Sequence, residues 1–239
     1  MRKHCLIAAL SVTAAVVAAG PALASPTAIW TVPTGKVTAP GNLHIGVYTF
    51  STPSRQPVLQ DGLTFGALPG LELGGVSGIG ALEVGIDTFA RNEVFNGKLQ
   101  LFGEGSLWPA VSLGGFNLAN TTGPSENILY GVMSKGFELG GVSLGNWTLG
   151  YFTTQTSDQT PSKSGLMGGM FYPLGARAGV AVDYLGNTTG FSGTNVYLTY
   201  GVAENAYLSV GHYFHPTDRE ADLTFMGVDM DLATGLFGH

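Results

Sequence analysis

Apolar and polar residues alternate along much of this chain with the period of two that β-strands impose. In residues 82–88, Leu, Val and Ile occupy one set of alternating positions, and Glu, Gly and Asp occupy the other. The same alternation recurs in residues 98–104, 146–154, 176–184, 195–202 and 225–232. This pattern predicts a chain built of β-strands, each with one polar face and one apolar face.

Turn-rich stretches divide the chain into about 12 predicted strands, with roughly 10 to 14 compatible with the pattern. These strands cover residues 42–50, 63–68, 71–89, 98–104, 110–118, 127–138, 146–156, 165–174, 176–186, 194–202, 205–214 and 221–232. Long connections are predicted at 51–61, 90–97, 119–126, 157–164, 187–193 and 215–220, and they alternate with shorter ones. An even strand count with alternating connections is typical of barrels in the bacterial outer membrane.

One predicted strand, residues 71–89, is longer than the about 9–11 residues that cross a bilayer. Gly78 and Gly80 are able to interrupt it. We therefore expect this stretch to protrude beyond the membrane, to carry a bulge or to form two strands.

Composition favours a membrane barrel over a soluble sandwich, which would also alternate but with its apolar face inward. Charged residues make up 11% of the chain and hydrophobic ones 44%, whereas about 25% charged residues are usual in soluble domains. Aromatic residues near strand ends are candidates for interfacial girdles: Trp30, Trp108, Trp147, Tyr151, Tyr172 and Tyr184. No apolar stretch after the leader is long enough for a membrane-spanning helix. The predicted fold class is all-β, an antiparallel up-and-down transmembrane β-barrel.

The first 24 residues have the pattern of a signal peptide, with Arg2 and Lys3 before an apolar stretch at 6–19 and small residues at Ala22 and Ala24. Cys5, the chain's single cysteine, lies in this leader, so the exported chain is expected to lack disulfides. The predicted organisation is a signal peptide at 1–24, an extended periplasmic lead-in at 25–41 and one β-barrel domain at 42–239. The predicted location is the cell outer membrane.

Charged residues on the polar faces of the strands are predicted to point into the barrel lumen. They are Glu83, Asp87, Lys98, Glu104, Lys135, Arg177, Asp183, Asp229 and Asp231. Internal ion pairs that fill the lumen and a narrow conducting channel both remain compatible with this set.

No catalytic motif is present in the sequence, and no cofactor or metal ligand set is predicted. The best group for nucleophilic catalysis is Ser209, His212 and His215, with Asp218 and Glu220 in the following loop. Ser209 and His212 differ in parity, so a regular strand places them on opposite faces. The 16 acidic against 10 basic residues argue against a nucleic-acid partner.

Several short motifs in the first two thirds of the chain resemble a known family. They are GLTFG at 62–66, LEL at 71–73, GKLQL at 97–101, Glu104, WPAVSLG at 108–114, YGVMSK at 130–135 and WTLG at 147–150. These motifs resemble the YjbH-type outer-membrane proteins associated with exopolysaccharide export operons, and related short barrels. The resemblance implies an outer-membrane barrel and a role connected with exopolysaccharide export.

The sequence therefore predicts a non-enzymatic outer-membrane β-barrel that acts as a small channel, an export accessory or a structural membrane protein. Its expected partners are outer-membrane lipid, the outer-membrane assembly machinery and a small solute or polysaccharide. The alternatives are a rim-active outer-membrane hydrolase or acyl-modifying enzyme, and a soluble secreted β-protein that binds glycans.

Overall fold

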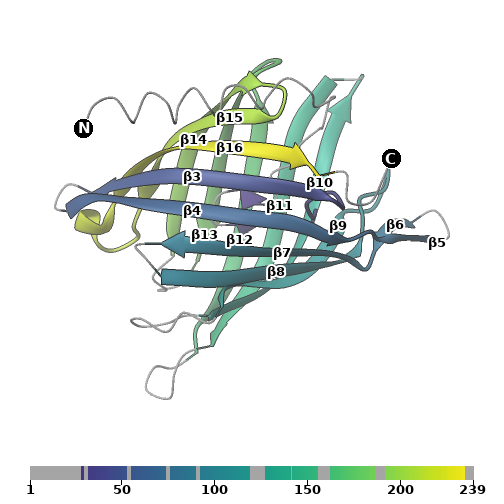
Figure 1. The fold of residues 1–239 in the computed structure, drawn as a ribbon, viewed down its shortest axis with the longest axis horizontal. Coiled ribbons are helices and arrows are strands. Elements are labelled where there is room, and N and C mark those ends of the chain that lie inside the picture. The colour runs from purple at the N-terminus through teal and green to yellow at the C-terminus, as the bar shows by residue number, and fades with distance from the viewer. Residues whose placement is uncertain are drawn as a thin grey trace.

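A computed structural model describes residues 28–29, 32–52, 55–73, 76–89, 92–118, 127–140, 142–155, 162–186 and 192–234. The predicted signal peptide, Trp30 and the last five residues lie outside this part of the chain. The described residues form a closed antiparallel barrel of 12 strands (Figure 1). The only helical element among them is a short 3-10 helix, η1 (Arg219–Ala221). Within the described part there is no helix long and apolar enough to span a membrane.

The wall consists of β3 (Asn42–Thr52), β4 (Arg55–Leu68), β7 (Ala81–Phe89), β8 (Asn92–Phe102), β9 (Ala110–Leu118), β10 (Asn127–Leu139), β11 (Val142–Gln155), β12 (Ser164–Pro173), β13 (Ala178–Leu185), β14 (Gly193–Ala203), β15 (Ala206–Phe214) and β16 (Leu223–Ala233). Each strand pairs with the next along this series, and β16 pairs with β3 to close the barrel. The fold class and the count of 12 strands are thus confirmed. We call the end where β3 begins and β16 ends the terminal mouth, and the opposite end the distal mouth.

Two predicted long connections at the distal mouth are wrong. Strands β3 and β4 continue through most of 51–61, with Thr52 paired to Arg55, and β8 begins at Asn92 within the predicted connection 90–97. Backbone hydrogen bonds between strands need no apolar side chains. The hydrophobic pattern therefore does not reveal the polar ends of these strands. From β9 onward the connections are long at the distal mouth and short at the terminal mouth, as predicted.

The overlong predicted strand 71–89 is divided in the structure. Ala81–Phe89 forms β7 of the wall, while β5 (Leu71–Leu73) and β6 (Val76–Ile79) form a separate hairpin. Gly78 and Gly80 have φ of 68° and 77°, which is backbone that glycine adopts without strain and that interrupts a strand. The hairpin extends beyond the barrel wall at the terminal mouth (Figure 1).

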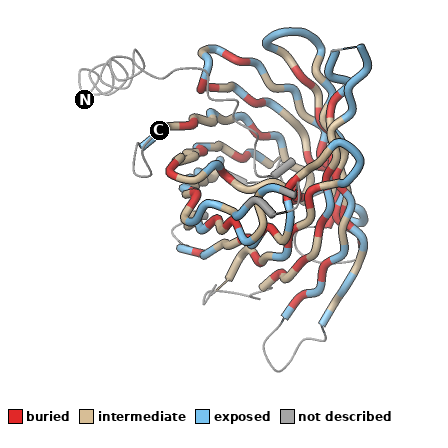
Figure 2. The backbone as a smooth tube through the Cα atoms, turned by 90° about the vertical axis from the view of Figure 1, so that its right-hand side faces the viewer, coloured by how far each residue is buried: buried red, intermediate tan, exposed pale blue. Residues whose placement is uncertain are grey.

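Burial alternates along the strands, as Figure 2 shows. Apolar side chains on the outside are exposed, among them Leu99, Leu149, Leu198, Val210 and Met226. Such a surface suits lipid and not water. The described aromatic girdle candidates fall near the two ends, with Tyr151 and Tyr184 towards the distal mouth and Trp108, Trp147 and Tyr172 towards the terminal mouth.

The described part of the predicted periplasmic lead-in 25–41 lies partly inside the barrel. Val32 is fully buried, and β2 (Val32–Pro33), which pairs with β1 (Ala28–Ile29), contacts β12 and β13 from within. The chain leaves the lumen near Pro40, which bridges to Gly66 of β4. We call residues 32–40 the strap. The sequence predicts an extended lead-in here because the wall strands that bury these residues are distant in the sequence.

Candidate functional site: the barrel lumen

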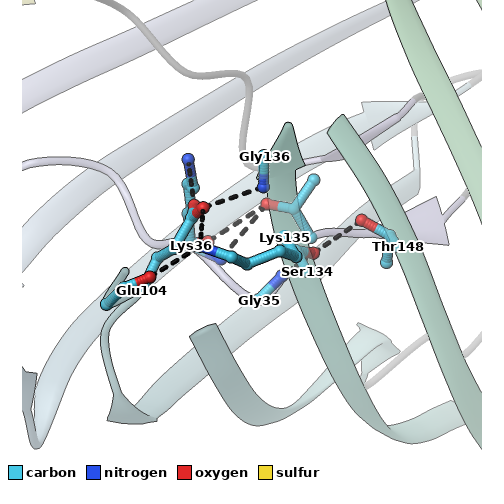
Figure 3. A network of polar contacts seen from close by, with 9 residues as sticks. Gly35, Lys36, Glu104, Ser134, Lys135, Gly136 and Thr148 are labelled. Atoms are coloured by element: carbon cyan, nitrogen blue, oxygen red, sulfur yellow. Dashed lines mark hydrogen bonds and ion pairs between the residues drawn. The ribbon is translucent and has the colours of Figure 1, made fainter. Parts of the chain in front are cut away.

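The strap is fixed to the inner wall by hydrogen bonds to its backbone. The amide of Gly35 donates to Ser134 Oγ at 2.7 Å, and Ser112 Oγ donates to the Gly35 carbonyl at 2.7 Å. The Ser134 hydroxyl in turn contacts Thr148 Oγ1 at 2.6 Å. Ser112, Ser134 and Thr148 are buried on the inner side of β9, β10 and β11, so three adjacent strands form this seat. Figure 3 shows Gly35 beside Ser134 and Thr148.

Glycine is required where the strap and the wall approach most closely. A Cβ on Gly35 would lie 2.4 Å from the carbonyl oxygen of Ala110, the first residue of β9. A Cβ on Gly66 of β4 would lie 2.2 Å from the carbonyl oxygen of Ala39 in the strap. Both obstacles are backbone atoms that cannot move aside. Close contact between the strap and the wall therefore requires a glycine in each of them, Gly35 in the strap and Gly66 in the wall.

A buried ion pair holds the strap at Thr38, near its exit from the lumen. Glu83 of β7 accepts hydrogen bonds from the amide of Thr38 at 2.6 Å and from its hydroxyl at 3.0 Å. Lys98 of β8 lies 3.6 Å from the other carboxylate oxygen of Glu83, and its side chain is 2% exposed. The charge of Glu83 is thus balanced by one cation and used to bind the strap.

A second carboxylate, Glu104, anchors the strap at the terminal mouth. It contacts Lys36 of the strap at 2.8 Å and Lys135 of β10 at 3.1 Å, and it accepts a hydrogen bond from the amide of Gly136 at 2.8 Å (Figure 3). Burial acts to raise the pKa of Glu104, but these contacts together outweigh it and hold the pKa below its ordinary value. We call Glu104, Lys36 and Lys135 the latch.

The inner end of the strap is packed in an apolar cluster inside the barrel. Val32 contacts this cluster, whose other members are Ile128, Tyr130, Val132, Phe152, Met167 and Leu185 of β10 to β13. Inward apolar side chains on these four strands depart from the polar lumen that the alternation predicts. The strap explains them, because Val32 packs against these apolar side chains.

The opposite side of the lumen carries a polar network that we call the acid wall, made of His44, Tyr48, Asp229 and Asp231. His44 of β3 lies between two carboxylates of β16, with Nδ1 2.9 Å from Asp231 and Nε2 3.4 Å from Asp229. The Tyr48 hydroxyl donates to Asp229. The side chains of His44, Asp229 and Asp231 are 11–18% exposed, so the acid wall is less enclosed than the seat of the strap.

Two further inward acids have amide partners. Asn96 donates to Asp87 at 2.8 Å, and Asn195 donates to Asp183 at 2.5 Å. Each pair joins neighbouring strands, β7 to β8 and β13 to β14. The amides satisfy these carboxylates with hydrogen bonds and carry no charge of their own.

The structure places six of the nine predicted lumen residues inside the barrel: Glu83, Asp87, Lys98, Asp183, Asp229 and Asp231. Glu104 and Lys135 lie at the terminal mouth, where Lys135 shares the outward side of β10 with Met133 but its ammonium reaches Glu104. Arg177 is exposed in the turn between β12 and β13, because β13 begins at Ala178 and not at the predicted residue 176. Sequence reasoning missed His44, although it lies on the first predicted strand, four positions before Tyr48 and therefore on the same face.

The residues considered for catalysis are not brought together. Ser209 points inward and donates to Asp229 at 3.4 Å, whereas His212, at the opposite parity of β15, contacts Thr224 on the outside. His215 uses Nδ1 to accept the amide of Asp218 in its own loop. Among the described residues, no group of three or more His, Cys, Asp or Glu side chains is arranged to hold a metal ion.

Comparison with known proteins gives the fold alone. No family model matches the chain, and no curated protein matches it. The KdgM porin superposes with a TM-score of 0.51 at 13% identity, over 78% of this chain and 98% of that one. A structure of the KdgM porin in complex with disordered oligogalacturonate gives 0.50 over the same shares at 13% identity. The outer membrane phospholipase of Salmonella typhi gives 0.47 at 16% identity, over 81% of this chain and 91% of that one.

Proposed function

We propose that this protein is a non-enzymatic channel of the bacterial outer membrane that passes small neutral or cationic solutes. The observation that carries the proposal is a closed barrel with apolar side chains outside and a carboxylate-rich wall inside. Backbone groups in hydrocarbon must all be paired, and a closed barrel achieves this. In this proposal the leader directs export, and the terminal mouth faces the periplasm as in other single-chain barrels.

The charge of the lumen supports the choice of solute. His44 lies against Asp229 and Asp231, while Asp87 accepts a hydrogen bond from Asn96 and Asp183 accepts one from Asn195. Fixed carboxylates in a narrow, low-dielectric passage favour cations and repel anions. The oligogalacturonate in the KdgM complex is a polyanion, so we do not extend that ligand to this barrel.

The alternative roles have less support. Hydrolysis at the rim would need Ser209 and His212 on one face, and they lie on opposite faces. A soluble glycan-binding protein would bury its apolar face, but here that face is outside. The resemblance to YjbH-type proteins suggests a setting for the channel, namely service to an exopolysaccharide export apparatus. Loss of secreted polysaccharide on deletion of the gene would support that setting, and unchanged secretion would contradict it.

The first experiment separates membrane fractions and then measures conductance. We expect outer-membrane material that migrates differently on a gel before and after boiling, as folded barrels do. In planar bilayers under a salt gradient, the purified protein should give a reversal potential of cation-selective sign. A soluble protein, or a folded barrel that favours anions, would contradict the proposal.

A further inference from the structure

We propose that the strap is a displaceable gate: while Gly35 and Lys36 are seated the lumen is obstructed, and release of the strap opens it. This inference rests on the proposed channel function. It arises from the path of residues 32–40, which run along the inner wall from β4 at the terminal mouth to the apolar cluster of β10 to β13. A segment on that path occupies space through which a solute would have to pass.

The contacts of the strap are those of a bound peptide and not of a wall strand. In the described residues, β2 pairs only with the short β1, and β1 and β2 join no barrel ladder. Apart from the bridge between Pro40 and Gly66, the backbone of the strap is held by side chains of the wall: Ser112 and Ser134 at Gly35, and Glu83 at Thr38. The barrel closes through β16 and β3 without it. Removing the strap from its seat therefore breaks no wall hydrogen bond of the closed barrel.

The latch is the weakest of the strap's attachments. The side chain of Lys36 is 35% exposed and that of Glu104 is 19% exposed, whereas Lys98 and Glu83 are 2% and 6% exposed. Ion pairs open to solvent contribute little and are screened by salt. Release is thus expected to begin at the latch and to spread along the strap in both directions, to Gly35 on one side and to Thr38 on the other.

Two variants displace the strap by different means. Gly35→Val places a Cβ against the backbone of Ala110, so the strap cannot remain seated while the barrel wall is unchanged. Glu104→Gln removes the charge of the latch and serves as a milder variant in case the first one folds poorly. The matched controls are Gly97→Ala, where a Cβ meets only the Glu83 carbonyl at 3.7 Å, and Glu138→Gln, an exposed carboxylate of β10 near the same mouth.

The test has two readouts on the refolded full chain in liposomes and planar bilayers. A reporter cysteine replaces Thr34, which is 5% exposed, in a Cys5→Ser background. A membrane-impermeant maleimide should label this cysteine faster in Gly35→Val and in Glu104→Gln than in either control. Single-channel conductance without the reporter should rise at least about twofold in Gly35→Val, because the passage is wider.

The outcomes separate this inference from the proposed channel. Faster labelling with higher conductance supports the gate. If labelling is faster but the variants conduct as the wild type does, the gate is overturned and the channel stands. If labelling is unchanged in both variants, the gate is overturned as well. Faster labelling with no conductance in any variant of the folded barrel overturns the channel itself, and the gate with it.

Discussion

The two sides of the lumen satisfy their inward side chains in different ways. On the side of β7 to β13, the chain's own strap covers the wall, and Val32, Ser112 and Lys98 are almost completely buried. On the side of β3 and β16, the described part of the strap does not cover the acid wall, and His44, Asp229 and Asp231 satisfy one another while keeping some exposure. One half of the lumen therefore behaves like a protein core and the other like the lining of a passage. Stability should depend on the first half and selectivity on the second.

The largest effect is expected from the apolar cluster beneath the strap. Phe152→Ala should lower the free energy of unfolding by about 3–5 kcal/mol, because a fully buried aromatic ring leaves a cavity. The measurement is denaturant unfolding of the barrel in lipid vesicles. Leu149→Ala, on the outward side of the same strand, is the control, since lipid can fill the space that it leaves. Equal losses in the two variants would contradict a core inside the barrel.

The buried ion pair comes next. Lys98→Met should cost about 3 kcal/mol, because it leaves the carboxylate of Glu83 enclosed without its cation. Combining it with Glu83→Gln should recover much of that loss, since no buried charge remains. The same unfolding assay applies to both variants. A double variant as unstable as Lys98→Met would show that the pair matters for packing and not for charge.

The acid wall should affect permeation more than stability. Asp229→Asn together with Asp231→Asn should lower the cation-to-anion permeability ratio at least about twofold, since two fixed negative charges are lost from the passage. The reversal potential in a salt gradient measures this ratio. Asp218→Asn, in the exposed loop beside η1, should leave it unchanged. An unaltered ratio in the double variant would place the solute path away from the acid wall.

The smallest effect concerns pH at the latch. Because the pKa of Glu104 is depressed in the folded protein, the latch contributes stability above the ordinary glutamate pKa and loses it as pH falls through the lowered value. The contribution is about 0.2–1 kcal/mol, as for ion pairs near solvent. Labelling of the Thr34→Cys reporter, taken relative to a fully exposed cysteine at the same pH because thiolate reactivity itself falls with pH, should therefore rise only at clearly acidic pH. Glu104→Gln should abolish that rise, and a rise that persists in this variant would point to another group.

The sequence alone determined the wall of the barrel. The strands predicted at 110–118 and 127–138 match β9 and nearly all of β10. Alternation elsewhere in the chain predicts the wall because one face of each strand meets lipid and the other does not. The parity of a strand also placed Glu83, Asp183 and Asp229 inward before any contact was known. Strand ends in polar stretches such as 51–61 could not be found, because backbone pairing there leaves no trace in hydrophobicity.

Only the tertiary structure decided what occupies the lumen. The residues that hold Gly35 lie 77 and 99 positions away in the sequence, so no local pattern connects them. His44 likewise meets Asp231 across 187 positions, where the last strand closes on the first. Local periodicity specifies which way a side chain points, but its partner depends on the closure of the barrel. The strap is the clearest case, since its short, proline-flanked sequence acquires a role only from the wall that surrounds it.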